Sequence, residues 1–244
     1  MAHERLFSRA VVRVAADGEG EDAAGFLQGL LTNDVTGALP VYAALLSAQG
    51  KTQFDMIVWP AGGGGLLLDC EADHAAELVK RLAMFRLRRK LVIAVDPSLG
   101  VFWQAEQGDG GAPDPRLPGL GQRWIAKVSD ADLAVDDAWL GHRLRLGVPE
   151  GRAELGDLLW LETNAAELHG VAFDKGCYIG QENTARMNWR QKVNRRVVVV
   201  PFDRSDESRR RAGYPELGFA IDHVRTENLD PALLPDWLSF NPAG

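Results

Sequence analysis

The residues of this sequence that could carry chemistry gather around one cysteine. Cys177 lies between two glycines in the segment 174–182, two residues after Lys175, and the residues 181–189 that follow are predicted to form a helix. A thiol ahead of a helix N-terminus lies in the positive field of the helix dipole, and a nearby ammonium group strengthens that field. Both effects favour the thiolate, so the segment predicts a reactive sulfur. Composition alone leaves a surface helix with a small, packed cysteine as the alternative.

Positive charge accumulates after this cysteine. From Lys175 to Arg196 the chain has six basic residues and one acid, whereas the net charge of all 244 residues is −7. Neutralising the phosphates of nucleic acid requires a broadly basic surface, so the overall balance argues against a nucleic-acid partner. The local basic run is still compatible with a small site that binds an anionic ligand.

The remaining composition is that of an ordinary globular protein. Two cysteines, Cys70 and Cys177, cannot form a disulfide framework, which predicts a reducing compartment. Cys70 ends an apolar run that is typical of a buried strand. No Cys or Cys/His spacing matches a zinc site, and no apolar run approaches the roughly 18 residues that cross a membrane. We therefore expect a cytoplasmic protein with no metal site and no membrane partner.

The segment around Cys177 resembles the signature of the YgfZ family of folate-binding proteins. These are relatives of the glycine-cleavage T-protein (aminomethyltransferase) and include mitochondrial proteins that help to mature iron–sulfur enzymes. The family motif Lys-Gly-Cys-aromatic-x-Gly-Gln-Glu is filled at every fixed position. The matching residues are Lys175, Gly176, Cys177, Tyr178, Gly180, Gln181 and Glu182, followed by Ala185, Arg186, Arg190, Lys192, Arg195 and Arg196.

Other segments resemble the same family, in the expected order, from about Phe26 to Val200. Their matching parts are 26–29 and 31–35 with Asn33 and Asp34, the turn 49–51 with Lys51, the basic segment 86–93, the segment 139–149 with Trp139, Arg143, Gly147 and Pro149, and the segment 158–164 with Glu162, where Trp160 replaces the usual proline.

Each of these candidates has an alternative that does not involve a ligand. Gly50-Lys51-Thr52 ends like a phosphate-binding P-loop, but Leu45 stands where that loop needs a glycine, so a strand–turn–strand is predicted. His169 precedes Cys177 by eight residues, yet no oxyanion-hole motif accompanies this potential Cys–His pair. The structural alternatives are a turn or cap for Asn33 and Asp34, core packing for Trp139 and a surface loop for Glu162.

The elements that must position these residues are helices and strands in mixed order, which gives an α+β class. The resemblance implies more: three small domains in a ring around a central cavity, with a shortened, β-barrel-like C-terminal domain. Periodicity predicts helices at 23–31, 73–87, 137–146 and 181–189, and strands at 10–14, 54–58, 66–70, 91–95, 123–128, 197–200 and 217–221. The domains implied are 1–47 with 131–192 as a discontinuous folate-binding domain, 48–130 as a second α+β domain, and 193–244 as a short C-terminal β domain.

The resemblance implies a tetrahydrofolate-binding accessory factor for iron–sulfur cluster assembly or repair. Its partners would be folate, as tetrahydrofolate or a one-carbon derivative, and iron–sulfur proteins or their assembly machinery. Cys177 would be the reactive centre with Lys175 and Arg186, and the basic run would attract the folate glutamate tail. The cofactor-binding set would be Asn33, Asp34, Lys51, Trp139, Glu162, Tyr178, Gln181 and Glu182.

The alternative function is a folate-dependent aminomethyltransferase of the T-protein type. That enzyme has an acid after a strand of its second domain. Ala75 and Ala76 stand at the matching positions here, and Asp73 is close but out of register. The T-protein also lacks the Lys-Gly-Cys motif, which favours the accessory factor. A protein-interaction module without a ligand is a third possibility.

Overall fold

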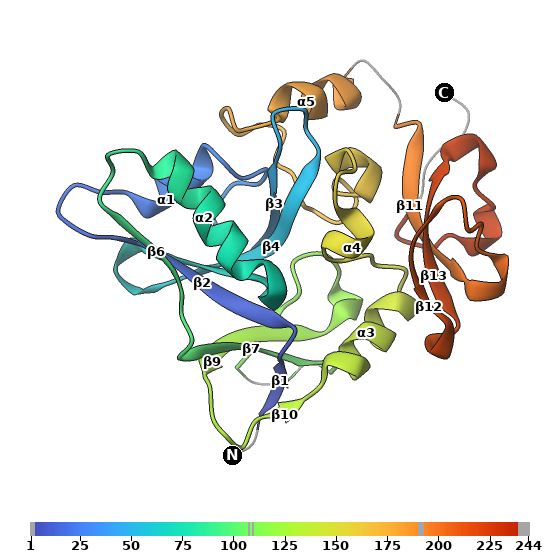
Figure 1. Ribbon diagram of the computed structural model, residues 1–244, viewed down its shortest axis with the longest axis horizontal. Helices are drawn as coiled ribbons and strands as arrows, with labels where there is room; N and C mark the ends of the chain where they lie inside the picture. The colour runs from blue at the N-terminus through green and yellow to red at the C-terminus, as the bar shows by residue number, and fades with distance from the viewer. Residues whose placement is uncertain (1–2, 107, 109, 190–192, 239–244) are drawn as a thin grey trace.

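The computed structural model describes residues 3–106, 108, 110–189 and 193–238 (Figure 1). Arg190 and Lys192 of the basic run lie outside the described residues. Within them the chain forms three β-sheets connected by helices, so the expected α+β class is confirmed. None of the helices in these ranges is long and apolar enough to span a bilayer.

The first sheet has five antiparallel strands in the order β3-β4-β5-β2-β6. One face of this sheet packs against two helices, because alternate strand residues such as Val12, Val14, Met56 and Leu68 are apolar and meet Leu78 of the second helix. The elements are β2 (Arg9–Ala16), α1 (Ala23–Gln28), β3 (Val41–Leu46), β4 (Thr52–Pro60), β5 (Leu66–Glu71), α2 (Ala75–Arg86) and β6 (Leu91–Val95).

The second sheet has the order β10-β1-β7-β9-β8, with β1 and β10 parallel and the other pairs antiparallel. The third sheet is antiparallel in the order β11-β13-β12. Their strands are β1 (Glu4–Leu6), β7 (Leu99–Gln104), β8 (Ala112–Pro113), β9 (Gln122–Lys127), β10 (Leu133–Ala134), β11 (Arg195–Pro201), β12 (Arg210–Tyr214) and β13 (Phe219–Arg225).

Three further helices lie in the chain between the second and third sheets: α3 (Asp136–Arg145), α4 (Arg152–Leu155) and α5 (Gln181–Trp189). Helix α4 contacts both β4 of the first sheet and β12 of the third, and Figure 1 shows it between the two. The 3₁₀ turns are η1 (Gly62–Gly64), η2 (Ala72–His74), η3 (Pro118–Leu120), η4 (Trp160–Thr163), η5 (Phe202–Arg204), η6 (Pro215–Leu217), η7 (Thr226–Asn228) and η8 (Pro231–Leu233).

Strand pairing does not follow the expected boundary between residues 47 and 48. This boundary falls in the β3–β4 hairpin, whose strands pair from Val41 with Val58 to Leu46 with Thr52. The second sheet likewise joins β1 and β10 to strands of the 48–130 segment. The two segments therefore share both sheets, because backbone hydrogen bonds run across the expected border. The third sheet lies wholly within 193–244.

Candidate functional site

Lys175 anchors the loop that carries Cys177. Its Nζ donates hydrogen bonds to the carbonyl oxygens of Gln28 (2.8 Å), Leu31 (2.6 Å) and Asn33 (2.9 Å). Gln28 ends α1, and carbonyls at a helix C-terminus carry partial negative charge that attracts a cation. Burial lowers the pKa of the Lys175 amine to about 8, and the charge of Asp34 opposes that shift. All three donors of the ammonium group are therefore used to hold the loop against the turn after α1.

The thiol itself remains at the surface. Cys177 is exposed, whereas the neighbouring Tyr178 is buried and its ring centroid lies 5.1 Å from Lys175 Nζ. Helix α5 begins at Gln181, so its predicted bounds are confirmed and Cys177 lies in the loop ahead of it rather than in its first turn. Lys175 thus fixes the position of the loop by contacts with carbonyls and an aromatic ring.

Two glycines let this loop approach the β3–β4 turn. Gly180 has φ +82°, and a Cβ on it would lie 2.6 Å from the carbonyl oxygen of Ser47 and 3.0 Å from Gly50 Cα. Gly50 has φ +77°, and its Cβ would lie 3.0 Å from Asn183 Cβ. Asn183 completes the contact by donating to the carbonyl of Gln49 at 2.5 Å. Gly50 is therefore required by packing against the motif as well as by the turn.

Asn33 and Asp34 lie beside this anchor, with their side chains in internal hydrogen bonds. Asn33 Nδ2 donates to the carbonyls of Tyr42 (2.8 Å) and His169 (2.7 Å). Asp34 Oδ1 accepts from the backbone N–H (3.0 Å) and the hydroxyl (2.7 Å) of Thr36, and these hydrogen bonds lower the pKa of Asp34. The pair shapes the turn to which Lys175 binds. No hydrogen bond joins His169 to Cys177 in the described part of the chain.

The other residues predicted near the motif are more exposed. Lys51 is exposed in the β3–β4 turn, and Gln181 is half-buried at the start of α5. Arg186 Nη2 donates to Glu182 Oε1 at 3.2 Å in an exposed pair on α5. Exposed pairs of this kind contribute little to stability, about 0.3–0.5 kcal/mol on a helix. None of these four side chains lines a described cavity.

Trp139 and Glu162 lie elsewhere. Trp139 is 3% exposed, and its Nε1 donates to Glu150 Oε1 at 3.0 Å. Arg123 lies 4.2 Å from the Trp139 ring centroid, and the centroid of the Trp103 ring lies 5.2 Å away in an edge-on arrangement. The Trp139 indole is therefore packed against other side chains and does not offer an open face for stacking. Glu162 Oε2 pairs with His223 Nε2 at 3.0 Å and lines a different cavity. Among the described cavities none is lined by both Trp139 and Glu162.

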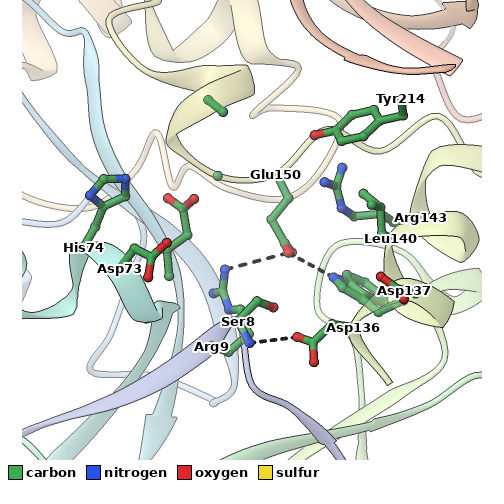
Figure 2. A pocket seen from close by; sticks show the side chains of 14 residues that line it. Ser8, Arg9, Asp73, His74, Asp136, Asp137, Leu140, Arg143, Glu150 and Tyr214 are labelled. Carbon is green, nitrogen blue, oxygen red and sulfur yellow. Dashed lines mark hydrogen bonds and ion pairs between the residues drawn. The ribbon is translucent and has the colours of Figure 1, made fainter. Parts of the chain in front are cut away.

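A cavity of about 290 Å³ lies where the three sheets meet (Figure 2). Residues of each part line it: Arg9 begins β2 of the first sheet, Asp136 and Trp139 belong to α3 beside the second sheet, and Tyr214 ends β12 of the third. Figure 2 shows Glu150 in its wall, linked by a dashed line to Arg9. Glu150 also accepts the hydrogen bond from Trp139 Nε1. Cys177 is not among the residues that line this cavity.

Behind the cavity lies a buried network of charged side chains that sequence reasoning missed. Glu150 Oε2 is 2.6 Å from Arg116 Nη1 and 3.2 Å from Arg123 Nη2. Although burial opposes ionisation, the charges of Arg116, Arg123 and Arg9 hold the pKa of Glu150 well below its ordinary value. The remaining pairs are Arg9 with Asp69 (2.6 Å), Arg123 with Asp69 (2.9 Å) and Asp114 (3.2 Å), and Arg116 with Asp114 (2.7 Å).

Asp55 adds a buried acid to this network. Its Oδ2 accepts a hydrogen bond from the Tyr42 hydroxyl at 3.2 Å, and burial raises the pKa of Asp55 to about 6. The signal in the sequence was its position in β4, where Asp55 shares a strand face with Ile57 and so points into a core. An acid in such a position must find buried partners.

Some polar groups of the cavity have no protein partner. Arg9 Nη1 is buried without a hydrogen bond and lies 3.7 Å from Glu150 Oε1. The carboxylates of Asp73 and Asp137 line the same cavity and accept no hydrogen bond from the described residues. The cavity can therefore offer two exposed carboxylate acceptors to a ligand, whereas Arg9 Nη1 is sealed from solvent beside Glu150. Within the described ranges, no three His, Cys, Asp or Glu side chains are grouped so that they could hold a metal ion.

Comparisons with known proteins place the chain in a family. No protein-family model matches it. It is 35% identical over 237 residues to the human "Iron-sulfur cluster assembly factor IBA57, mitochondrial", covering 81% of this chain and 65% of that protein. It is 32% identical over 232 residues to the Neurospora crassa homologue, covering 80% and 52%. The chain thus spans about half to two thirds of the length of these curated relatives.

The fold has a solved counterpart. The crystal structure of the glycine cleavage system aminomethyltransferase T from Bartonella henselae matches with a TM-score of 0.64 over 93% of this chain and 79% of that chain, at 13% sequence identity. This likeness shows a shared α+β fold of the T-protein type. The resemblance read from the motif around Cys177 is confirmed by these relatives. The chain belongs to the IBA57/YgfZ family.

Proposed function

We propose that this protein is an accessory factor for iron–sulfur cluster assembly and that the Cys177 thiol is its reactive group. The names of its relatives support the first part. The observation that carries the second is the anchor: three carbonyls hold Lys175 so that the motif loop is fixed while Cys177 stays exposed. Cys70 differs, because burial raises the pKa of its thiol to about 12 and keeps it protonated.

An exposed thiol of this kind can serve, as a thiolate, as a ligand for a cluster that is passed between proteins. Clusters are held mainly by cysteine thiolates, usually four. Since the described residues offer no group of three potential ligands, Cys177 would supply one ligand and an iron–sulfur protein or the assembly machinery would supply the others. The exposed Arg186 and Glu182 on α5 would then lie at the contact. The expected cytoplasmic location remains a prediction, and the printed names place the relatives in mitochondria.

We further propose that the cavity between the three sheets is the central cavity of a T-protein-like ring and takes the pterin head of a folate. A pterin carries a carbonyl acceptor beside ring N–H and amino donors. The N–H and amino donors match the free carboxylates of Asp73 and Asp137. The volume of about 290 Å³ is near the lower limit of ligand pockets, so it suits the head rather than a whole folate.

The protein residues would bind and orient this head. Asp73 and Asp137 would accept from the N–H groups, and Trp139 would close the wall behind the ring. The carboxylates of Asp73 and Asp137 would repel the glutamate tail, which would therefore extend out of the cavity. Bound tetrahydrofolate would supply a one-carbon carrier. The roles proposed for Asn33, Asp34, Lys51, Glu162, Tyr178, Gln181 and Glu182 in folate binding are supported only by the resemblance of their segments to the family.

The thiol is tested by complementation. In a strain that lacks the endogenous factor, we expect the wild-type gene to restore iron–sulfur enzyme activity and Cys177→Ala to fail. Cys70→Ala is the matched control and should restore activity if it folds, because its thiol is buried. Full restoration by Cys177→Ala would refute the role of this thiol.

The folate site is tested separately by anaerobic calorimetric titration with tetrahydrofolate. We expect Asp73→Asn to weaken binding about tenfold, since a hydrogen bond to a charged group is typically worth about 1.5–3 kcal/mol. Asp130→Asn, at an exposed position outside the cavity, should bind like the wild type. Absence of binding to the wild type would remove folate from the proposal and leave the thiol role intact.

An aminomethyltransferase is the second candidate, and one observation favours it. Asp73, expected to be out of register, does line the cavity between the three sheets. A carboxylate there could act as a general base toward a bound folate. Formaldehyde release in a glycine-cleavage assay distinguishes the two functions. Turnover that is lost in Asp73→Asn would favour the enzyme over the accessory factor.

A further inference from the structure

The end of α2 carries an exposed apolar projection that the proposed function does not use. Leu87, the residue after α2, is 85% exposed, and Met84 in its last turn is 60% exposed. Single apolar residues on a surface are ordinary, so their exposure alone says little. The backbone of Leu87 makes this case different.

Leu87 has φ 51° and ψ −114°. This region suits glycine, because a Cβ crowds the backbone there. A leucine at this position is therefore unfavourable in two independent ways, by its backbone conformation and by its contact with water. Strained backbone conformations concentrate at functional sites, where a particular side chain must be presented. The observation points to a role for the leucine side chain outside the isolated chain.

The surroundings of Leu87 are strongly cationic. Residues 80–90 include six basic residues and no acid, in a chain of net charge −7. Arg86 and Arg89 are already engaged, with the carbonyl of Leu91 at 2.9 Å and with Glu21 at 3.1 Å. Arg88 is exposed and lines a surface hollow of about 550 Å³ together with Leu87 and the paired Glu21 and Arg89. The result is an apolar centre with a free cation at its rim.

We propose that Met84, Leu87 and Arg88, here called the Leu87 projection, dock into a partner protein that offers an apolar pocket rimmed by carboxylates. Charge complementarity selects this partner, since a cationic rim on an acidic protein favours a local acidic surface. An anionic membrane fits less well, because binding to a bilayer scales with the apolar area inserted and the projection offers only two apolar side chains, Met84 and Leu87. The projection belongs to α2 and not to the Cys177 loop, so the proposal is independent of the thiol.

The partner is identified by photo-crosslinking in cells of the source organism. Leu87→p-benzoylphenylalanine is compared with the same replacement at Leu133, a second exposed leucine that is 60% exposed on β10. We expect one protein to crosslink from position 87 and not from position 133. No adduct specific to position 87, an adduct with a second copy of this chain, or flotation of the protein on phosphatidylglycerol vesicles that depends on Leu87 would overturn the proposal.

The purified partner is then titrated against three variants of the full chain. We expect Leu87→Gly to weaken binding at least about tenfold while raising the melting temperature, because glycine relieves the backbone strain and loses the side chain. A loss of binding with a gain in stability cannot come from misfolding. Arg88→Glu should also weaken binding and reverse its salt dependence, and Leu133→Ser should bind like the wild type. Unchanged binding by Leu87→Gly would overturn the proposal.

Discussion

Two cationic sites in this protein are built in opposite ways. At the junction of the three sheets, Arg9, Arg116 and Arg123 are buried and neutralised by ionised carboxylates, with Glu150 in contact with all three. At the motif loop, Lys175 is held by three neutral carbonyls and by the face of Tyr178. Buried ions attract strongly and cannot be unpaired without a large penalty. Carbonyls hold a cation more weakly and fix its place by geometry.

The difference indicates what each site is for. The network joins β2 and β5 of the first sheet to β9 of the second and to the loop before α4, so it fixes the relative positions of these two sheets beside the cavity. The Lys175 anchor joins only the motif loop to the turn after α1, so it fixes the place of one exposed sulfur. We therefore expect defects in the network to unfold the protein and defects at the anchor to loosen one loop.

Among the variants that test this comparison, Glu150→Ala should have the largest effect on stability. It would leave Arg116, Arg123 and Arg9 facing one another without their shared carboxylate. Removing one partner of a buried ion pair typically costs about 3–5 kcal/mol, and we expect a loss of that size in the free energy of unfolding by urea. A loss below about 1 kcal/mol would show that the network is not what holds the sheets together.

The pH dependence of the network follows from Asp55. Its pKa is raised from 3.8 to about 6 in the folded protein, so the folded state binds an extra proton between these values. The contribution of Asp55 to stability therefore falls as the pH rises from about 4 to about 6, by about 3 kcal/mol. Asp55→Asn removes this dependence. We expect the stability of the variant relative to the wild type to increase over that range, measured by urea unfolding at several pH values. A constant difference would contradict the raised pKa.

At the anchor we expect a smaller and more local loss. Lys175→Met removes three hydrogen bonds and leaves three carbonyls to find water, which we expect to cost about 2 kcal/mol. Amide hydrogen exchange should rise in residues 28–35 and in the motif loop, and not in the third sheet. Lys51→Met, at an exposed lysine, is the control and should change stability by less than about 0.5 kcal/mol. If amide hydrogen exchange rose evenly over the chain, Lys175 would stabilise the whole fold, as the buried network does, and not one loop.

Gly176 and Gly180, on either side of Cys177, allow the dependence of the loop on close packing to be tested within one loop. Gly180→Ala would place a methyl group 2.6 Å from the carbonyl oxygen of Ser47 at positive φ, and we expect it to lower stability by about 1–2 kcal/mol. Gly176→Ala meets no atom within 4 Å and should be neutral. Thermal unfolding of both variants measures this. Equal effects would mean that the loop does not depend on its approach to the β3–β4 turn.

The sequence predicted the anchor region well because its signals are local. The motif and the helix that follows are contiguous, and α5 has the expected bounds. The partners of Lys175 could not be predicted, since they lie 142 to 147 residues earlier in the chain. The expected border at 47/48 failed to follow the sheets for the same reason, because strand pairing across it depends on the tertiary arrangement.

The network was invisible to sequence reasoning because its members are dispersed. Arg9, Asp69, Arg123 and Glu150 come from four distant segments, and each alone is an ordinary polar residue at the edge of an apolar run. Trp139 was singled out for stacking on a pterin, yet the arginine that covers one face of its ring comes from β9 and carries no local signal. Asp73 was set aside for its register, although η2 places it at the cavity.

The Lys175 anchor also bears on how the chain matures. Its two halves are separated by more than half of the sequence, with α1 made early and the motif loop made late. In a growing or truncated chain, the loop that carries Cys177 therefore stays unanchored until it contacts the turn after α1. The reactive role proposed for Cys177 would therefore be available only to molecules that have finished folding, and a partly synthesised chain would lack it.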